Sequence, residues 1–319
     1  MSTNKVKYRA LCSQEPSIPL FSQAWWLDAV AGDAWDVALL EQEGIIAASL
    51  PYVMRTRLGL ALIGQPILTP NLGPWLRSGE ARSARRLAKE KNLLQGLYQL
   101  LPAFAQYNQN WYCERTNWLP LYWMGYEQST RYTYRIEQLE DLEAVWSGFD
   151  TNIRTDIRKA ENKFSLQVRT DCSIEIFLEL NKKVFERQSL AVPYSKDVVL
   201  AIHAAAQSQN ACKLFVAVDE QGRQHAGVFI LWDSNSAYYL LGGGDPDLRN
   251  SGATSLCMWR AIQFAATVTK KFDFEGSMIE PVERFFRGFG ATQAPYSVIT
   301  KTNSRVIRTL HFLRTIRAG

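Results

Sequence analysis

The chain has 319 residues, a length more typical of two domains than of one, and 47% of its residues are hydrophobic, which is ample for ordinary cores. Its 36 basic and 31 acidic side chains leave a formal net charge of +5, which suits an anionic ligand but is too small for a DNA-binding tail. The five cysteines and three histidines are scattered, so neither a disulfide framework nor a metal site is expected.

The amino-terminal 21 residues lack the long apolar core of a secretory signal. No apolar run approaches the roughly 18 residues that a membrane-spanning helix needs. We therefore expect a soluble cytoplasmic protein without a transmembrane segment. The oligomeric state is left open.

Secondary structure in the first half begins with a helix over residues 23–30, with Ser22 as its cap and Gly32 as its stop. Two strands within 35–57 follow, joined by a turn at Glu41 to Gly44. A loop rich in proline and glycine, residues 64–75, leads to a basic amphipathic helix over 79–101. An aromatic, strand-like segment then ends near Ile136.

The second half alternates helices and strands more regularly. Helices are predicted over 139–147, 151–163, 173–188, 195–209, 253–269, 281–288 and 304–317, and strands over 164–169, 212–218, 224–232, 237–244, 271–276 and 294–301.

A weak internal repeat links the two halves. The turn Glu41-Gln42-Glu43-Gly44 aligns with Asp219-Glu220-Gln221-Gly222, and apolar strands flank both turns. This spacing exceeds that of solenoid repeats and favours one domain type used twice. We predict a mixed α/β sheet in each of two domains, residues 1–136 and 137–319, with ligands at strand ends.

A phosphate site is predicted where the third strand of the second half leads through a glycine-rich turn into a helix. Unpaired backbone N–H groups at a helix start bind phosphate, and Arg249 adds a cation. The alternative is a plain strand-to-helix connection in which Ser251 or Thr254 caps the helix. The residues predicted to bind this phosphate group are Arg249, Asn250, Ser251, Gly252, Ala253 and Thr254.

This Arg-x-x-Gly-Ala turn before a long helix resembles the pyrophosphate loop of the GNAT acyltransferase superfamily, Gln/Arg-x-x-Gly-x-Gly/Ala, with Thr254 in place of glycine or alanine. The chain is most similar to the tandem-GNAT branch of FemAB-type aminoacyltransferases and BioF2-like acetyltransferases. The residues that carry this likeness are 19–23 with Trp26-Leu27, Asn152-Ile153-Arg154 with Arg158-Lys159-Ala160, Leu241 to Gly244, and Phe272 to Ser277 with Phe286 and Phe289-Gly290.

The resemblance implies two GNAT-like domains and transfer of an acyl group from an activated carrier to an amine. That carrier is a thioester such as acyl-CoA or an ester on tRNA. We expect acyl-CoA as a co-substrate, without a metal or a tightly bound cofactor. The developing oxyanion needs a backbone donor at a strand bulge. Gly243, between Gly242 and Gly244 at the end of the third strand, permits that geometry.

The stretch Phe272-Asp273-Phe274-Glu275-Gly276 supplies the candidate base. Strand alternation predicts that Asp273 and Glu275 share one face. We assign Glu275 as general base or clamp on the acceptor amine, with Asp273 as its orienting neighbour. The alternative is a structural ion pair of these carboxylates with Arg284 or Arg287.

The thiolate that leaves the thioester needs a general acid. Tyr239 or the adjacent Tyr238 is the candidate, although neighbouring strand tyrosines usually pack in the core. His225 is interpreted as structural, because no carboxylate stands at a telling spacing from it. The proline-rich stretch 62–75 is expected to be a degenerate counterpart of the carrier loop.

Three functions compete at this point. The first is N-acyl transfer from acyl-CoA to an amino group of a small molecule or cell-envelope precursor. The second is Fem-type aminoacyl transfer from aminoacyl-tRNA to a peptidoglycan precursor, against which stands the lack of a sustained charged heptad run between Val168 and Lys213. The third is a catalytically inactive GNAT pair that acts as a binding protein.

Overall fold

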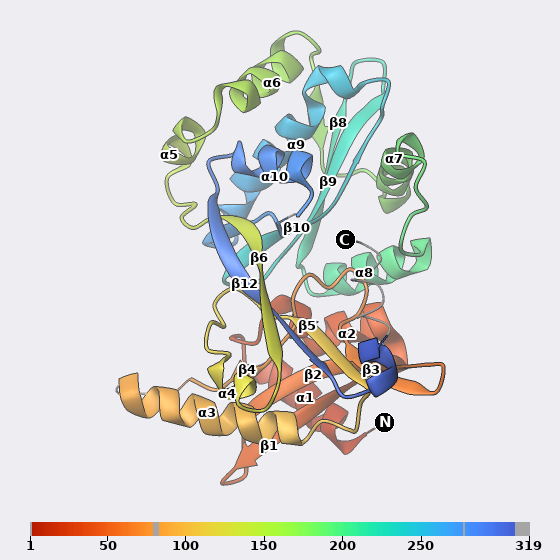
Figure 1. Ribbon diagram of the computed structural model, residues 1–319. Helices are drawn as coiled ribbons and strands as arrows, with labels where there is room; N and C mark the ends of the chain where they lie inside the picture. The colour runs from red at the N-terminus through yellow and green to blue at the C-terminus, as the bar shows by residue number, and fades with distance from the viewer. Residues whose placement is uncertain (1, 79–82, 277, 310–319) are drawn as a thin grey trace. The chain divides into compact units, whose positions relative to one another are not determined.

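The computed structural model describes residues 2–78, 83–276 and 278–309 (Figure 1). Two compact units make up the chain: Met1–Arg131 together with Pro295–Gly319, and Tyr132–Ala294. The closing helix predicted over 304–317 runs past residue 309 and so lies largely outside the described residues, as does Ser277.

The first unit is a mixed sheet with helices packed on it. Strands β1, β2 and β3 form an antiparallel meander, β3 then pairs in parallel with β5, and β5 pairs antiparallel with β12 (Thr292–Thr302). The elements of this half are α1 (Thr3–Gln14), α2 (Ala24–Ala31), β1 (Trp35–Gln42), β2 (Ile45–Arg57), β3 (Leu60–Gly64), β4 (Trp75–Leu76), α3 (Ser83–Gln99), β5 (Gln106–Asn110), α4 (Leu119–Tyr122) and β6 (Glu127–Ile136).

Helix α3 anchors this unit through its carboxyl-terminal half. Leu93, Leu94, Leu97 and Tyr98 are buried against the strands, and each fully buried side chain of this size stabilises the fold by about 2 kcal/mol. The Tyr98 hydroxyl lies 2.8 Å from that of Tyr107 on β5, which satisfies both polar groups inside the core. The sequence did not predict helix α1, which lacks a strong apolar periodicity.

The second unit repeats the mixed arrangement. Strands β7, β8, β9 and β10 pair antiparallel in that order, β10 pairs in parallel with β11, and β11 pairs antiparallel with β6. Its elements are α5 (Leu142–Ser147), α6 (Thr151–Asn162), β7 (Gln167–Arg169), α7 (Ile174–Arg187), α8 (Lys196–Ser208), β8 (Cys212–Val218), β9 (Gln224–Trp232), β10 (Ser236–Gly244), the short 3-10 helix η3 (Arg249–Ser251), α9 (Ala253–Ala265), β11 (Lys271–Asp273) and α10 (Glu280–Arg287).

Alternation along β9 divides the helices between the two faces of this sheet (Figure 1). Val228 and Ile230 pack in the core with α9, whereas Phe229 between them contacts Phe177 of α7 and His203 of α8. A strand buried on both faces is apolar at every position, as the sequence 226–231 is.

The repeat expected from the two hairpins is present in the topology. In each half, two helices precede a three-stranded meander, a helix crosses over, and the next strand pairs in parallel with the third. The hairpin turns themselves differ. Gln42 pairs directly with Ile45, whereas Val218 pairs with Gln224 across a longer loop.

The sequence-based boundary at residue 136 differs from the observed units in two respects. The strand that ends the second half, β12, pairs with β5 through Val298–Thr302, and residues 295–319 therefore group with the first unit. Conversely, Arg135 and Ile136 of β6 pair with β11 in the second unit. Local sequence signals do not reveal such an exchange, because the partners are more than 130 residues apart.

Within the described residues, no helix is long and apolar enough to cross a membrane.

Candidate functional site

Strand β10 changes its pairing half-way along. A register shift against β9 between Tyr239 and Leu241 marks a bulge. On the opposite edge, parallel pairing with β11 extends only from Ser236 to Tyr238, although β10 continues to Gly244. The second half of β10 therefore presents an edge that no described strand covers, and a bulge beside an open edge leaves backbone N–H groups for a ligand.

Helix α9 begins directly after this strand and its loop. Gly252 is the N-cap in a left-handed conformation, with φ of +81°, and no side chain caps the helix. A Cβ at this position would collide with the carbonyl oxygen of Asp156 on α6, so both the backbone angle and the close approach require glycine. The first-turn N–H groups have no partner within the helix.

The side chains of this loop fall into two groups. Arg249, Asn250 and Thr254 are exposed at the helix start. Ser251 is only 1% exposed, and its hydroxyl has no hydrogen-bond partner among the described residues. Neither Ser251 nor Thr254 caps α9, so both predicted caps are wrong. Phosphate binding at this uncapped start stays a prediction.

Helix α7 explains why β10 is glycine-rich. A Cβ at Gly243 would lie 2.6 Å from the backbone nitrogen of Asn181. The side chain of Asn181 donates a hydrogen bond of 2.7 Å to the Gly242 carbonyl and accepts one of 2.9 Å from the Tyr194 hydroxyl. Gly243 thus permits close packing of a helix on the strand, and its contact with a carrier stays a prediction.

Tyr239 lies over the bulge. Its hydroxyl occupies the space that a Cβ on Gly242 would take, and its ring packs 5.6 Å from that of Phe286. Burial, with a smaller contribution from Tyr194, raises the pKa of Tyr239 well above its usual value. The hydroxyl therefore stays protonated at neutral pH and can donate a hydrogen bond.

Asp273 is held by the neighbouring strand. It is buried, accepts a hydrogen bond from the Thr133 hydroxyl and lies 3.6 Å from Nε of Arg135, both on β6. Of the two arginines predicted as alternative partners, Arg287 bonds to Glu283 at 2.9 Å. The strand pairing that brings β6 beside β11 was not evident from the sequence.

Glu275 lies beyond the strand, which ends at Asp273. Its φ of +58° is left-handed, and its backbone nitrogen donates to the Asp273 carboxylate at 2.8 Å. The expectation that strand alternation places both carboxylates on one face is therefore wrong. Asp273 instead accepts a hydrogen bond from the turn that carries the half-buried Glu275. The role of Asp273 as an orienting neighbour of Glu275 stays a prediction.

A buried pair that the sequence did not predict lies at the β8–β9 turn. Nε2 of His225 is 3.1 Å from the Asp219 carboxylate, which also accepts from Arg223. Burial raises the pKa of Asp219, but the hydrogen bonds from His225 and Arg223 outweigh burial and hold it well below the usual range. The interpretation that no carboxylate stands at an informative spacing from His225 is wrong, because the hairpin turn brings Asp219 back to it.

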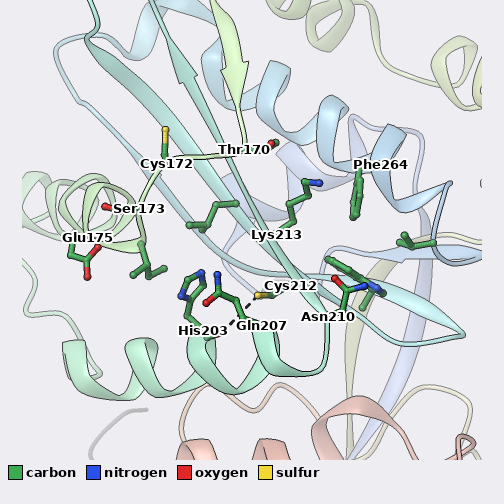
Figure 2. Close-up of a pocket in the computed structure, with 14 residues that line it drawn as sticks. Thr170, Cys172, Ser173, Glu175, His203, Gln207, Asn210, Cys212, Lys213 and Phe264 are labelled. Atoms are coloured by element: carbon green, nitrogen blue, oxygen red, sulfur yellow. Dashed lines mark hydrogen bonds between the residues drawn. The ribbon is translucent and has the colours of Figure 1, made fainter.

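A separate cavity of about 600 Å³ opens in the second unit beside β8 (Figure 2). Burial lowers the pKa of His203, against the opposing effect of Glu175, and the Lys213 ammonium lies 4.2 Å from the Phe264 ring centroid. No predicted site residue lines this cavity. It is lined by Thr170, Cys172, Ser173, Ile174, Glu175, His203, Gln207, Asn210, Cys212, Lys213, Leu214, Trp232, Phe264 and Val268.

Comparison with known proteins gives this geometry a family context. Residues 147–280 match the family profile of the acetyltransferase (GNAT) domain. The match contains the bulged strand, the uncapped helix start and both carboxylates. No curated protein matches the chain.

Solved structures share the fold over nearly the whole chain. The match to the structure of FemX has a TM-score of 0.68 at 11% identity and covers 93% of this chain and 96% of the FemX chain. The carboxyl-terminal domain of a putative lysylphosphatidylglycerol synthetase from Agrobacterium fabrum has a TM-score of 0.58 at 10% identity, covering 96% and 95%. L-PGS from Bacillus licheniformis has a TM-score of 0.54 at 13% identity, covering 97% and 95%.

At these identities the likeness shows the fold alone. The predicted mixed α/β class and GNAT fold are confirmed. Among the described residues, no group of histidine, cysteine and carboxylate side chains is arranged to hold a metal ion.

Proposed function

We propose that this protein is an N-acyltransferase that moves an acyl group from acyl-CoA, in the cytoplasm, to an amino group of a small molecule or cell-envelope precursor. The observation that carries the proposal is the uncapped start of α9, with Gly252 as N-cap and Arg249 beside it, directly after the bulged strand β10. Phosphates of the carrier would bind at the helix start, and the thioester would lie along the open strand edge.

The reaction needs three groups near the thioester carbonyl. A backbone N–H at the bulge after Tyr239 would stabilise the oxyanion. Glu275 would accept the proton that the attacking amine loses as the new C–N bond forms, directly or through water. When the C–S bond breaks, the thiolate would accept a hydrogen bond from the Tyr239 hydroxyl and take its proton from water, because the raised pKa of Tyr239 makes this phenol a weak acid.

Carrier binding is the first test, measured as thermal stabilisation of the purified chain by acetyl-CoA, longer acyl-CoAs and free CoA. A ligand at a hundred times its dissociation constant adds about 2.7 kcal/mol to the free energy of unfolding. The key variant is Thr254→Glu, because its carboxylate would occupy the phosphate position while remaining favourable at a helix start. Thr254→Ala is the matched control, since it removes the side chain without adding charge.

The expected result is a shift with at least one CoA species that Thr254→Glu abolishes and Thr254→Ala retains. Absence of any shift with CoA species would overturn acyl-CoA as the carrier. Equal thermal stabilisation of both variants by a CoA species would show that its phosphates do not bind at the start of α9.

Fem-type aminoacyl transfer from aminoacyl-tRNA is the second candidate, supported by the fold shared with FemX. Helices α7 and α8 have 14 and 13 residues, too short for the long helical hairpin that Fem-type enzymes often carry in the second domain. A salt-sensitive tRNA complex without a CoA shift would favour this candidate. Failure of both carriers would leave the inactive, partner-binding alternative.

A further inference from the structure

The cavity beside β8 lies at an edge of the sheet that is only partly covered. The terminal strand β7 has three residues and pairs with β8 from Val216 to Val218. Residues 212–215 of β8 therefore have a strand partner on one side alone, namely β9. After Arg169 the chain leads into α7, and no described strand continues along this edge.

The backbone of this edge has hydrogen-bonding groups without a partner. The N–H of Trp232 donates to the carbonyl of Ala211 at 3.0 Å, and this bond sets the alternation along the β8–β9 ladder. Lys213 therefore exchanges hydrogen bonds with β9, whereas the N–H and C=O groups of Cys212 and Leu214 point away from β9. No hydrogen bond joins these outward groups to another described residue. Leu214 is only 5% exposed, and an unpaired backbone group in so buried a residue costs free energy comparable to a lost hydrogen bond.

The cavity reaches both faces of the sheet at this edge (Figure 2). Lys213 lies on the face that α9 covers, where its ammonium packs on the Phe264 ring. Cys212 lies on the opposite face, and its thiol points to the carbonyl of His203 on α8, 3.9 Å away. A cavity lined from both faces must extend past the edge of the sheet. Its volume of about 600 Å³ is within the range of sites that enclose a small ligand or a short segment of chain.

We propose that residues 212–215 of β8 bind an extended peptide by strand addition, antiparallel to β8 and in line with β7. In this mode of recognition the added strand pairs with the free N–H and C=O groups of the sheet edge. Two peptide residues, one on either side of a central position, exchange hydrogen bonds with Leu214 and Cys212. The class of partner is therefore an extended polypeptide segment.

The central residue of the peptide lies opposite Lys213. This pair exchanges no hydrogen bonds, so its two side chains lie close together on the α9 face, and an acid there pairs with the ammonium. The flanking side chains point to the other face. There the exposed Glu175, whose charge acts on His203, disfavours a further acid. The favoured segment has one acidic residue between uncharged or basic ones.

A second copy of the chain is the competing occupant, because an open strand edge can pair with its own kind. Its β8 would bring its own α8 and α9 to an edge that these helices already flank, which favours a single isolated strand. The inference does not rest on the proposed acyl transfer, since none of the predicted acyl-transfer residues lines the cavity.

The test uses the full chain and the capped peptide acetyl-Thr-Val-Glu-Val-Thr-amide, whose β-branched residues favour the extended state. Nuclear magnetic resonance follows hydrogen exchange at single backbone amides of the protein. In the free protein, the amides of Cys212 and Leu214 should exchange at least about 10-fold faster than that of Lys213. Saturation with the peptide should slow both by a similar factor.

Two N-methylated peptides separate backbone from side-chain recognition. Methylation of both valine nitrogens removes the donors that face β8 and should abolish binding. Methylation of the glutamate nitrogen, which faces away from β8, is the matched control and should retain binding.

A charge exchange tests the central position. Lys213→Glu should weaken binding of the glutamate peptide about 5-fold or more, and a peptide with lysine in place of glutamate should bind this variant better than it binds the wild type. Lys89→Glu, at an exposed lysine of α3, should leave both affinities unchanged. Circular dichroism melts confirm that each variant is folded.

Slow exchange of Cys212 and Leu214 in the free monomer would overturn the proposal. Absence of protection by the glutamate peptide, or equal affinity for the two methylated peptides, would overturn it as well. A dimer in which both amides are protected without peptide would replace the peptide by a second copy of the chain.

Discussion

Asn181 on α7 holds the carbonyl of Gly242 on β10 through a hydrogen bond of 2.7 Å. Asn181 is 4% exposed and also accepts a hydrogen bond from the Tyr194 hydroxyl. Its side-chain amide therefore links α7, β10 and the loop between α7 and α8. This contact fixes the strand just beyond its bulge, where the proposed oxyanion donor lies. The sequence offered no signal for it, because Asn181 and Gly242 are joined only by the packing of α7.

Replacing Asn181 with alanine should therefore affect both stability and catalysis. We expect the free energy of unfolding to fall by about 1–3 kcal/mol, because a buried carbonyl and a hydroxyl lose a partner. The rate at saturating substrate should fall more than the KM changes, since the oxyanion donor shifts. Tyr194→Phe, which removes only the outer hydrogen bond, is the control and should cost about 1 kcal/mol or less.

Gly252 should tolerate alanine less well than another left-handed glycine. Gly222 has φ of +77° and open space around it, so Gly222→Ala should cost only the backbone strain of about 1 kcal/mol. Gly252→Ala adds a collision with the Asp156 carbonyl and should cost about 1–3 kcal/mol more, measured by urea unfolding. Similar losses in the two variants would contradict the close approach of α6 to this loop.

Substitutions of Asp273 and Glu275, near the end of β11, should differ in their effects on stability and on acyl transfer. Asp273→Ala leaves the buried Arg135 without this partner and should lower the free energy of unfolding by about 3 kcal/mol. Glu275→Gln should change stability by no more than about 0.5 kcal/mol but reduce acyl transfer by about 10²-fold or more. Undiminished turnover in Glu275→Gln would remove Glu275 from the mechanism.

Acid should destabilise the second unit through Asp219. Its folded-state pKa is held below the unfolded value of about 3.9, so its contribution is present above that pH and is lost as the pH falls through and below it. Between about pH 5 and about pH 2.5, the wild type should lose more unfolding free energy than Asp219→Asn does. Parallel stability curves for the two proteins would show that the His225 and Arg223 bonds do not favour the ionised carboxylate.

Local patterns predicted the elements well. Apolar periodicity and turn residues placed helices α6, α7 and α8 within a few residues of their observed bounds, because these signals lie within one or two helical turns. The loop that leads into α9 was recognised from Arg249 and Gly252, since a glycine before a long apolar helix is itself a local signal.

The sequence by itself determined the mixed α/β class, the repeated hairpins and the position of the candidate carrier loop, because each depends on neighbours in the chain. Only the tertiary structure decided that Arg135 pairs with Asp273, that Glu275 lies past a strand end, and that β12 completes the first unit. These outcomes depend on contacts between residues far apart in the chain, which no local periodicity encodes.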